Sequence, residues 1–135
     1  MSEDPDQIHV AKQWIAKADN DLRNAEHTIQ LEVDCPFDTV CFHAQQCAEK
    51  CLKALLVFHG IDPPRVHDVR MLVRQLPPQA AGRFDIEGLL VLNRYSVEAR
   101  YPGEWDPILR EDAEEALRLA RLVRETTREL LSSGP

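Results

Sequence analysis

The side chains best suited to chemistry lie between residues 41 and 56, in the sequence CFHAQQCAEKCLKALL. On a helix, residues three and four positions apart share a face. One stripe of this segment would then carry an imidazole, an amide and two ammonium groups, from His43, Gln46, Lys50 and Lys53. These groups could bind a phosphate or a nucleotide. The same pattern also fits a polar dimer seam or a solvated helix face, and all three interpretations stay open.

A second group of chemically able side chains lies at 94–101, where two arginines alternate with two tyrosines: Arg94, Tyr95, Arg100 and Tyr101. An arginine can bind a phosphate through two hydrogen bonds, and a tyrosine ring can stack on a base. The structural alternative is that the tyrosines pack in the core and the arginines pair with Glu98 or Glu104.

His67 precedes Asp68, which is well placed to cap a short helix. The histidine could orient this helix start, or it could belong to the same polar site as the arginines and tyrosines of 94–101. We favour the first interpretation, because the first turn of a helix needs acceptors and packing.

Four cysteines, at 35, 41, 47 and 51, lie close together in the sequence. His43, Cys47 and Cys51 follow one another at i, i+4 and i+8, which makes a metal site conceivable. Zinc sites, however, usually take paired ligands from separate elements. Neighbours at i and i+4 on a helix do not normally form disulfides. We interpret the cysteines as small core residues, and we predict neither a metal site nor a cofactor.

Helical periodicity must position these side chains, since no hairpin signal occurs in the chain. The first helix begins at the Asp4-Pro5 cap signal and the last at the similar Asp106-Pro107. The expected helices cover about 5–29, 37–58, 69–76, 85–99 and 107–131. This predicts an all-α fold, an up-and-down antiparallel bundle of about five helices, formed as a single domain over 1–135 with an ordered core of about 5–131.

Composition limits the function. The 135 residues carry 23 acidic and 16 basic side chains, a net charge of −7, which argues against a surface that binds nucleic acid everywhere. Residues 39–82 are the only net-positive third, with five bases against three acids, so an anionic ligand is expected there. No apolar run reaches the roughly 18–20 residues that span a bilayer, and the start is no signal peptide, so we expect no membrane contact and a cytoplasmic location.

Several short motifs, in order along nearly the whole chain, resemble those of HEPN domains. They are WIAKADNDL at 14–22, FHAQQ at 42–46 followed by EK and LKAL, GIDPP at 60–64 with HDV at 67–69, and NRY at 93–95 with EARYP at 98–102. The resemblance implies a helical bundle that dimerises and binds nucleotides. It also implies a partner, a minimal nucleotidyltransferase, in an arrangement like that of toxin–antitoxin systems.

Some HEPN proteins are metal-independent ribonucleases, which use an arginine followed by four to six residues and a histidine. No arginine of this chain precedes a histidine at that spacing, so the sequence favours a noncatalytic module. An atypical ribonuclease site would need a substitute pair, either Lys53 with His59 or His43 with Arg94. A pure interaction module is the third hypothesis.

The predicted dimer places an isologous contact at the second helix and the 94–101 region. Leu56 lies outside the expected core arc of that helix, close to Phe42. Two apolar side chains flanking a polar stripe are typical of an interface rim. We therefore expect Phe42 and Leu56 to line the dimer contact.

Overall fold

The computed structural model describes residues 4–96 and 107–133, and these residues form helices and connecting turns. Three long helices carry the fold: α1 (Pro5–Thr28), α2 (Phe37–Phe58) and α6 (Arg110–Ser132). Between α2 and α6 lie the short helices α3 (Val69–Arg74), α4 (Pro78–Ala81) and α5 (Ile86–Leu89), and the 3₁₀ helix η1 (Leu90–Tyr95). The predicted all-α helical bundle is confirmed.

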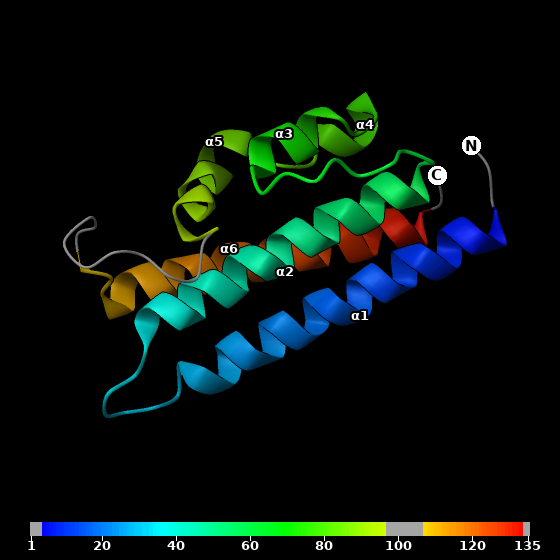
Figure 1. Ribbon diagram of the computed structural model, residues 1–135. Helices are drawn as coiled ribbons and strands as arrows, with labels where there is room; N and C mark the ends of the chain where they lie inside the picture. Colours follow the sequence, from blue (N-terminus) through cyan, green and yellow to red (C-terminus); the bar gives the residue numbers. More distant parts are fainter. Residues whose placement is uncertain (1–3, 97–106, 134–135) are drawn as a thin grey trace.

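The arrangement of the long helices places α2 at the centre. It packs along α1 on one side and along α6 on another, and α3 and η1 also contact it. Figure 1 shows that α1 and α2 run in opposite directions, whereas α6 runs in the direction of α2 because the short helices carry the chain back. As a result α2 is covered on almost every side.

The first two helices begin and end close to where the sequence predicts. Asp4 caps α1, because its side chain accepts a hydrogen bond from the Asp6 amide at 2.9 Å, and Pro5 stands in the first turn. Residues 37–58 form α2 as expected, and the chain turns after it at Gly60, whose φ of 76° is the left-handed conformation that glycine adopts most easily.

The predicted helix over 85–99 is wrong in its described part, because residues 86–95 divide into α5 and η1. Leu89, Leu92 and Tyr95 are all buried, at intervals of three residues. A 3₁₀ helix has three residues per turn, so it aligns these three side chains in one row, whereas on an α-helix they would spread over about 120° of the surface. Burial of this face explains the tighter winding.

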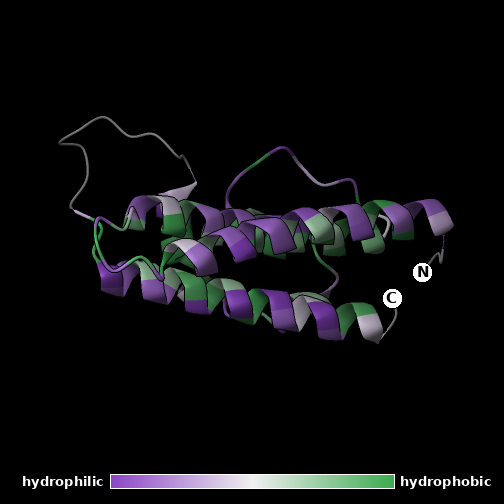
Figure 2. Cartoon of the chain, turned by 90° about the horizontal axis from the view of Figure 1, so that it is seen from below, coloured by the Kyte–Doolittle hydropathy of each residue, from purple (hydrophilic) through white to green (hydrophobic). Residues whose placement is uncertain are grey.

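The last helix begins later than its predicted start near Asp106. It starts at Arg110, and the Asp112 carboxylate accepts a hydrogen bond from the Leu109 amide at 2.8 Å. An acid in the first turn also suits the positive end of the helix dipole. The inner face of α6 is built from small and aliphatic residues, Ala113, Ala116, Leu117, Ala120 and Val123. Figure 2 shows hydrophobic and hydrophilic residues alternating along α1 and α6, as expected for helices with one buried side.

Arginines of α6 reach across to α1. Arg124 binds Asp19 through two hydrogen bonds of 2.5 and 3.2 Å, and Arg121 lies 3.0 Å from Glu26. These bonds join the two outer helices across the bundle.

No helix in the described part of the chain is long and apolar enough to cross a membrane.

Small residues let the helices approach closely. Cys41, Cys47 and Cys51 of α2 are fully buried and all four cysteines are free, which confirms the interpretation of these three as small core residues. A hydrogen bond to Cys51 and burial both raise the pKa of Cys47. Burial also raises the pKa of Cys41, to about 12, although its hydrogen bond with Tyr95 opposes this.

The prediction that Leu56 lines a dimer contact is wrong. Its side chain is fully buried within the chain, and Phe42 is half-buried. Because the chain turns at Gly60, the Ile61 amide donates a hydrogen bond to the Leu56 carbonyl at 2.8 Å, and the following segment covers this side of α2. The apolar pattern of this segment predicts one buried face on α2, but neighbours pack around nearly all of the helix.

Candidate functional site

Asp21 of α1 is the first of two buried carboxylates that organise the polar residues of α2. Its side chain is 11% exposed. One oxygen lies 2.8 Å from Nδ1 of His43, and the other accepts a hydrogen bond of 2.5 Å from Nζ of Lys50. His43 and Lys50 are two helical turns apart on α2, so they reach the same carboxylate from its two sides.

Glu49 of α2 is the second carboxylate, and its side chain is only 3% exposed. Its Oε1 atom lies 2.6 Å from Nδ1 of His67 and 3.3 Å from Nζ of Lys53. Gln46 donates a hydrogen bond of 3.2 Å to the other oxygen. The two buried carboxylates thus each bind one lysine and one histidine. We call Asp21, Glu49 and the residues that they bind the α2 polar network.

The glutamines connect this network to the segment that follows α2. Gln46 donates to Oε1 of Gln45 at 2.8 Å, and Gln45, which is fully buried, donates to the backbone carbonyl of His67 at 3.3 Å. These bonds hold His67 against α2. These contacts differ from the favoured prediction that His67 orients a helix start, because its side chain binds Glu49, while Asp68 caps α3 by accepting a hydrogen bond from the Arg70 amide at 2.9 Å.

The structure therefore brings together five sequence-predicted residues, which are His43, Gln46, Lys50, Lys53 and His67. Their accessibility differs widely. The His67 side chain is 63% exposed, His43 and Lys50 are about one-fifth exposed, and Lys53 is nearly buried, with Nζ lying 5.6 Å from the centre of the Trp14 ring. A ligand could reach the network at His67, Lys50 and His43.

Charge in the network differs from what the sequence suggests. The two ammonium groups are balanced by Asp21 and Glu49, so with neutral imidazoles the network has no net charge. Sequence reasoning missed both acids as site residues. A signal for Asp21 is present, because it falls between Ala18 and Ala25 on the buried face of α1, and a buried acid needs a partner.

The second predicted group is only partly described, since Arg100 and Tyr101 lie outside the described residues. Tyr95 is 4% exposed and hydrogen-bonds with Cys41, and burial raises the pKa of its hydroxyl to about 12. The Arg94 guanidinium lies 5.6 Å from the centre of the Tyr95 ring. The Tyr95 ring is thus part of the core and is not exposed for stacking.

Asn93, which is not among the predicted site residues, joins η1 to the start of α3. Its Oδ1 accepts a hydrogen bond from the Val69 amide at 3.0 Å, and its Nδ2 donates to Asp68 at 2.9 Å. Burial alone would raise the pKa of Asp68, but the bonds from Asn93 and from the Arg70 amide outweigh it and lower that pKa. The short helices are thereby fixed above α2.

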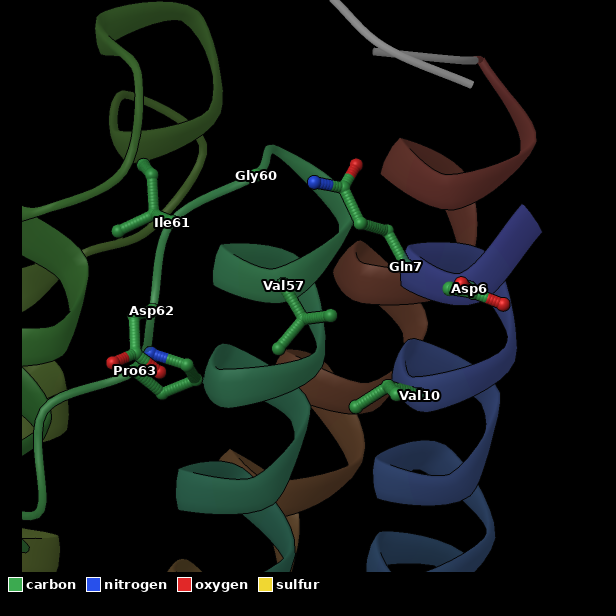
Figure 3. A pocket seen from close by; sticks show the side chains of 8 residues that line it. All are labelled: Asp6, Gln7, Val10, Val57, Gly60, Ile61, Asp62 and Pro63. Atoms are coloured by element: carbon green, nitrogen blue, oxygen red, sulfur yellow. The ribbon is translucent and has the colours of Figure 1, made fainter. Parts of the chain in front are cut away.

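A separate hollow of about 310 Å³ lies between the start of α1 and the end of α2 (Figure 3). Figure 3 shows the Gln7 side chain extending toward Gly60, over Val10 and Val57. The Gln7 Oε1 atom is buried without a hydrogen-bond partner among the described residues, and so is His59 Nδ1. The predicted site residues do not line this hollow. Burial lowers the pKa of His59.

The comparisons with known proteins agree with one another. A family model for the HEPN domain matches residues 11–130. The chain is 33% identical over 140 residues to a Methanocaldococcus jannaschii protein named "Putative toxin MJ1304", covering 92% of this chain and 90% of that protein. Similar solved structures are TT1696 from Thermus thermophilus (TM-score 0.75, 30% identity, 88% of this chain and 96% of that chain) and ST0689, described as an archaeal HEPN homologue (TM-score 0.69, 25% identity, 88% and 95%).

Proposed function

The chain belongs to the HEPN domain family, and from that premise we propose that it is a noncatalytic module that binds nucleotide or RNA. It works in a system like that of toxins and antitoxins, together with a small nucleotidyltransferase. The name of the Methanocaldococcus jannaschii relative supports the toxin-like context.

The α2 polar network is the observation that carries this proposal. It holds Lys50, His43 and His67 in fixed positions, and each retains some exposed surface. A phosphate that approaches Lys50 competes with Asp21 for the ammonium group, and the imidazoles add hydrogen-bond donors when they are protonated. Preorganised donors lower the entropy cost of binding, because their side chains are already ordered.

A titration of the protein with AMP, with ATP and with a short single-stranded RNA tests the proposal. The expected result is binding that weakens as salt increases, since phosphate contacts release counterions. Lys50→Gln should weaken binding, whereas Lys12→Gln on the exposed side of α1 should leave it unchanged. Equal affinities of the two variants would show that the α2 polar network does not bind the nucleotide or RNA.

The proposed assembly has two further parts, a homodimer and the nucleotidyltransferase partner. The dimer contact involves the outer surface around Phe42 and the 94–101 region, and the buried Leu56 takes no part in it. Sedimentation at tens of micromolar tests the dimer. A monomeric mass would overturn it, and copurification with the product of an adjacent nucleotidyltransferase gene would support the partner. The protein acts in the cytoplasm under this proposal.

A ribonuclease is the second candidate function, and the two anchored imidazoles favour it. Both His43 and His67 contact a buried carboxylate through Nδ1, which orients each ring and leaves Nε2 for proton transfer. One imidazole would take the proton of a ribose 2′-hydroxyl, which attacks the phosphorus. The other would protonate the 5′-oxygen that leaves, and a cyclic phosphate would result.

The substitute pairs suggested by the sequence receive less support. Lys53 is bound by Glu49, while His59 follows the end of α2, and His43 pairs with Asp21 rather than with Arg94. Incubating the protein with structured RNA in the presence of a chelator decides the matter. Cleavage that His43→Ala and His67→Ala each abolish supports the ribonuclease, and intact RNA leaves the noncatalytic module. Absence of any ligand binding would leave a pure interaction module.

A further inference from the structure

The α2 polar network lacks an uncompensated positive charge, so a polyanion needs cations from another part of the chain. The segment 63–76 supplies them. It holds three arginines, Arg65, Arg70 and Arg74, against the single acid Asp68, within a chain whose net charge is −7. This local excess adjoins the network, because His67 lies in the same segment and contacts Glu49.

The packing of α3 turns two of these arginines outward. Val69, Leu72 and Val73 are buried against the rest of the fold. The opposite face therefore carries Arg70 and Arg74, one helical turn apart. Arg65 and His67 are exposed in the preceding loop. We call Arg65, His67, Arg70 and Arg74 the α3 track.

Neutralisation of the α3 track by neighbouring acids is slight. Two carboxylates lie near it in the sequence: Asp62, which makes no ion pair with any described residue, and Asp68, which already accepts hydrogen bonds from the Arg70 amide and from Asn93. Arg70 lies 3.6 Å from Asp68, a contact that orients its half-exposed guanidinium. Arg65 and Arg74 make no ion pair with any described residue. Two of the three arginines thus keep their full charge for a ligand.

We infer that the α3 track binds the phosphate backbone of single-stranded RNA, leading it from His67 along the outer face of α3. This inference rests on the proposed function and specifies its ligand. Arg70 and Arg74 are about 6 Å apart along the helix axis, given a rise of 1.5 Å per residue. Cations spread in this way contact successive phosphates, whereas the phosphates of a mononucleotide would reach only part of the track.

The polarity of the α3 track favours RNA over an acidic protein. A stable protein interface has an apolar core inside a polar rim. On the outer face of α3 the large apolar side chain with substantial exposure is Met71, at 44%. A surface of arginine, histidine and glutamine with one methionine offers no such core, but it suits contacts with a sugar-phosphate backbone.

The test compares two double variants that remove the same charge. Arg70→Gln with Arg74→Gln alters the α3 track. Arg118→Gln with Arg128→Gln alters two exposed arginines of α6 that pair locally with Glu115 and Glu125. Fluorescence polarisation with a labelled 12-nucleotide RNA gives the affinity at several salt concentrations. The track variant should bind roughly tenfold more weakly, with a salt slope smaller by about 1.4, while the control matches the wild type.

Four results would overturn the inference. Equal RNA affinity of the track variant and the wild type would show that the α3 track does not bind RNA, and it would leave the proposed function unaffected. Binding of polyglutamate as tightly as RNA, lost in the track variant, would assign the track to an acidic protein instead. Wild-type protein that binds AMP but not RNA would restrict the ligand to a nucleotide, and protein that binds neither would contradict the proposed function itself.

Discussion

Nδ1 of His43 lies 2.8 Å from Oδ1 of Asp21, across the contact between α2 and α1. The same carboxylate binds Lys50, so one buried acid of α1 holds two cationic or hydrogen-bonding groups of α2. The spacing of these polar side chains on α2 resembles that of a solvated helix face. In the structure they instead contact α1, and only part of their surface is exposed. The site and the stability of the fold therefore depend on the same acid.

Replacing Asp21 by alanine should destabilise the fold by about 3 kcal/mol, because it leaves Lys50 and His43 without their partner in a largely buried position. Asp21→Asn should cost less, since an amide oxygen can still accept a hydrogen bond. Urea unfolding measures both. Glu32→Ala, in the exposed turn after α1, is the control. A loss at Asp21 no larger than that of the control would contradict the assigned contact.

Leu56→Ala should lower the free energy of unfolding by about 2–5 kcal/mol, as expected for a fully buried leucine. Leu122→Ala, at a leucine of α6 that is 51% exposed, should have a much smaller effect. Denaturant titration of both variants checks this. A Leu56→Ala variant that retains full stability but changes the oligomeric state would show that Leu56 lies in a dimer contact and is not buried within the chain.

Stability should fall in alkali from about pH 9 upward. Burial raises the pKa values of Cys41 and Tyr95 to about 12, from 9.0 and 10.0. Both groups are neutral in the folded protein, so their contribution is complete below the ordinary values and is lost as pH rises toward 12. Thermal unfolding between pH 8 and 11 should show a shallower decline for Cys41→Ala with Tyr95→Phe than for wild type. An unchanged slope would contradict the burial of these groups.

The cysteines should differ in their reactivity toward a thiol reagent. Cys35 is half-buried, whereas Cys41, Cys47 and Cys51 are fully buried, and the thiolate is the reactive form. At pH 8 the native protein should react at Cys35 first, and Cys35→Ser should remove the rapid phase. The other three thiols should react when urea unfolds the chain. Rapid labelling of Cys47 in the native protein would argue against this core.

Asn93→Ala should loosen the short helices, because it removes the acceptor of the Val69 amide and a donor to Asp68. The expected loss is about 1–3 kcal/mol. Hydrogen exchange provides the local measurement, with faster exchange at 69–74 and unchanged protection in the centre of α2. Exchange rates at 69–74 that are the same in the variant and the wild type would show that Asn93 does not hold η1 to α3.

The ends of a helix and its core residues could be predicted from the sequence where a local residue pattern alone determines them. Asp4-Pro5, Pro36 and Gly60 mark the ends of α1 and α2 through local backbone chemistry. The division of 86–95 was not predictable in this way, because burial of Leu89, Leu92 and Tyr95 by other elements selects the 3₁₀ winding. Tertiary packing outweighed local propensity there.

The positions of the polar residues of α2 were predictable from the sequence, but the charge that surrounds them was not. The helical stripe places His43, Gln46, Lys50 and Lys53 on one side of α2, since a helix fixes their spacing. Asp21 comes from a different helix, so periodicity within 41–56 does not show its pairing with Lys50. Glu49 and Lys53, in contrast, stand at i and i+4, a helical spacing that does indicate an ion pair. An acid on the apolar face of α1 was the available signal.

Equilibrium binding of single-stranded RNA and of AMP to wild-type protein, His67→Gln and His9→Gln tests whether the α2 polar network binds nucleotide or RNA. His67 is the most exposed histidine or lysine of the α2 polar network, and His9 is an exposed histidine of α1 that serves as a matched control. We predict salt-sensitive binding by the wild type and by His9→Gln, with several-fold weaker binding by His67→Gln. Absence of binding by the wild type at low salt, or equal affinity of all three proteins, would contradict the binding of nucleotide or RNA at the α2 polar network.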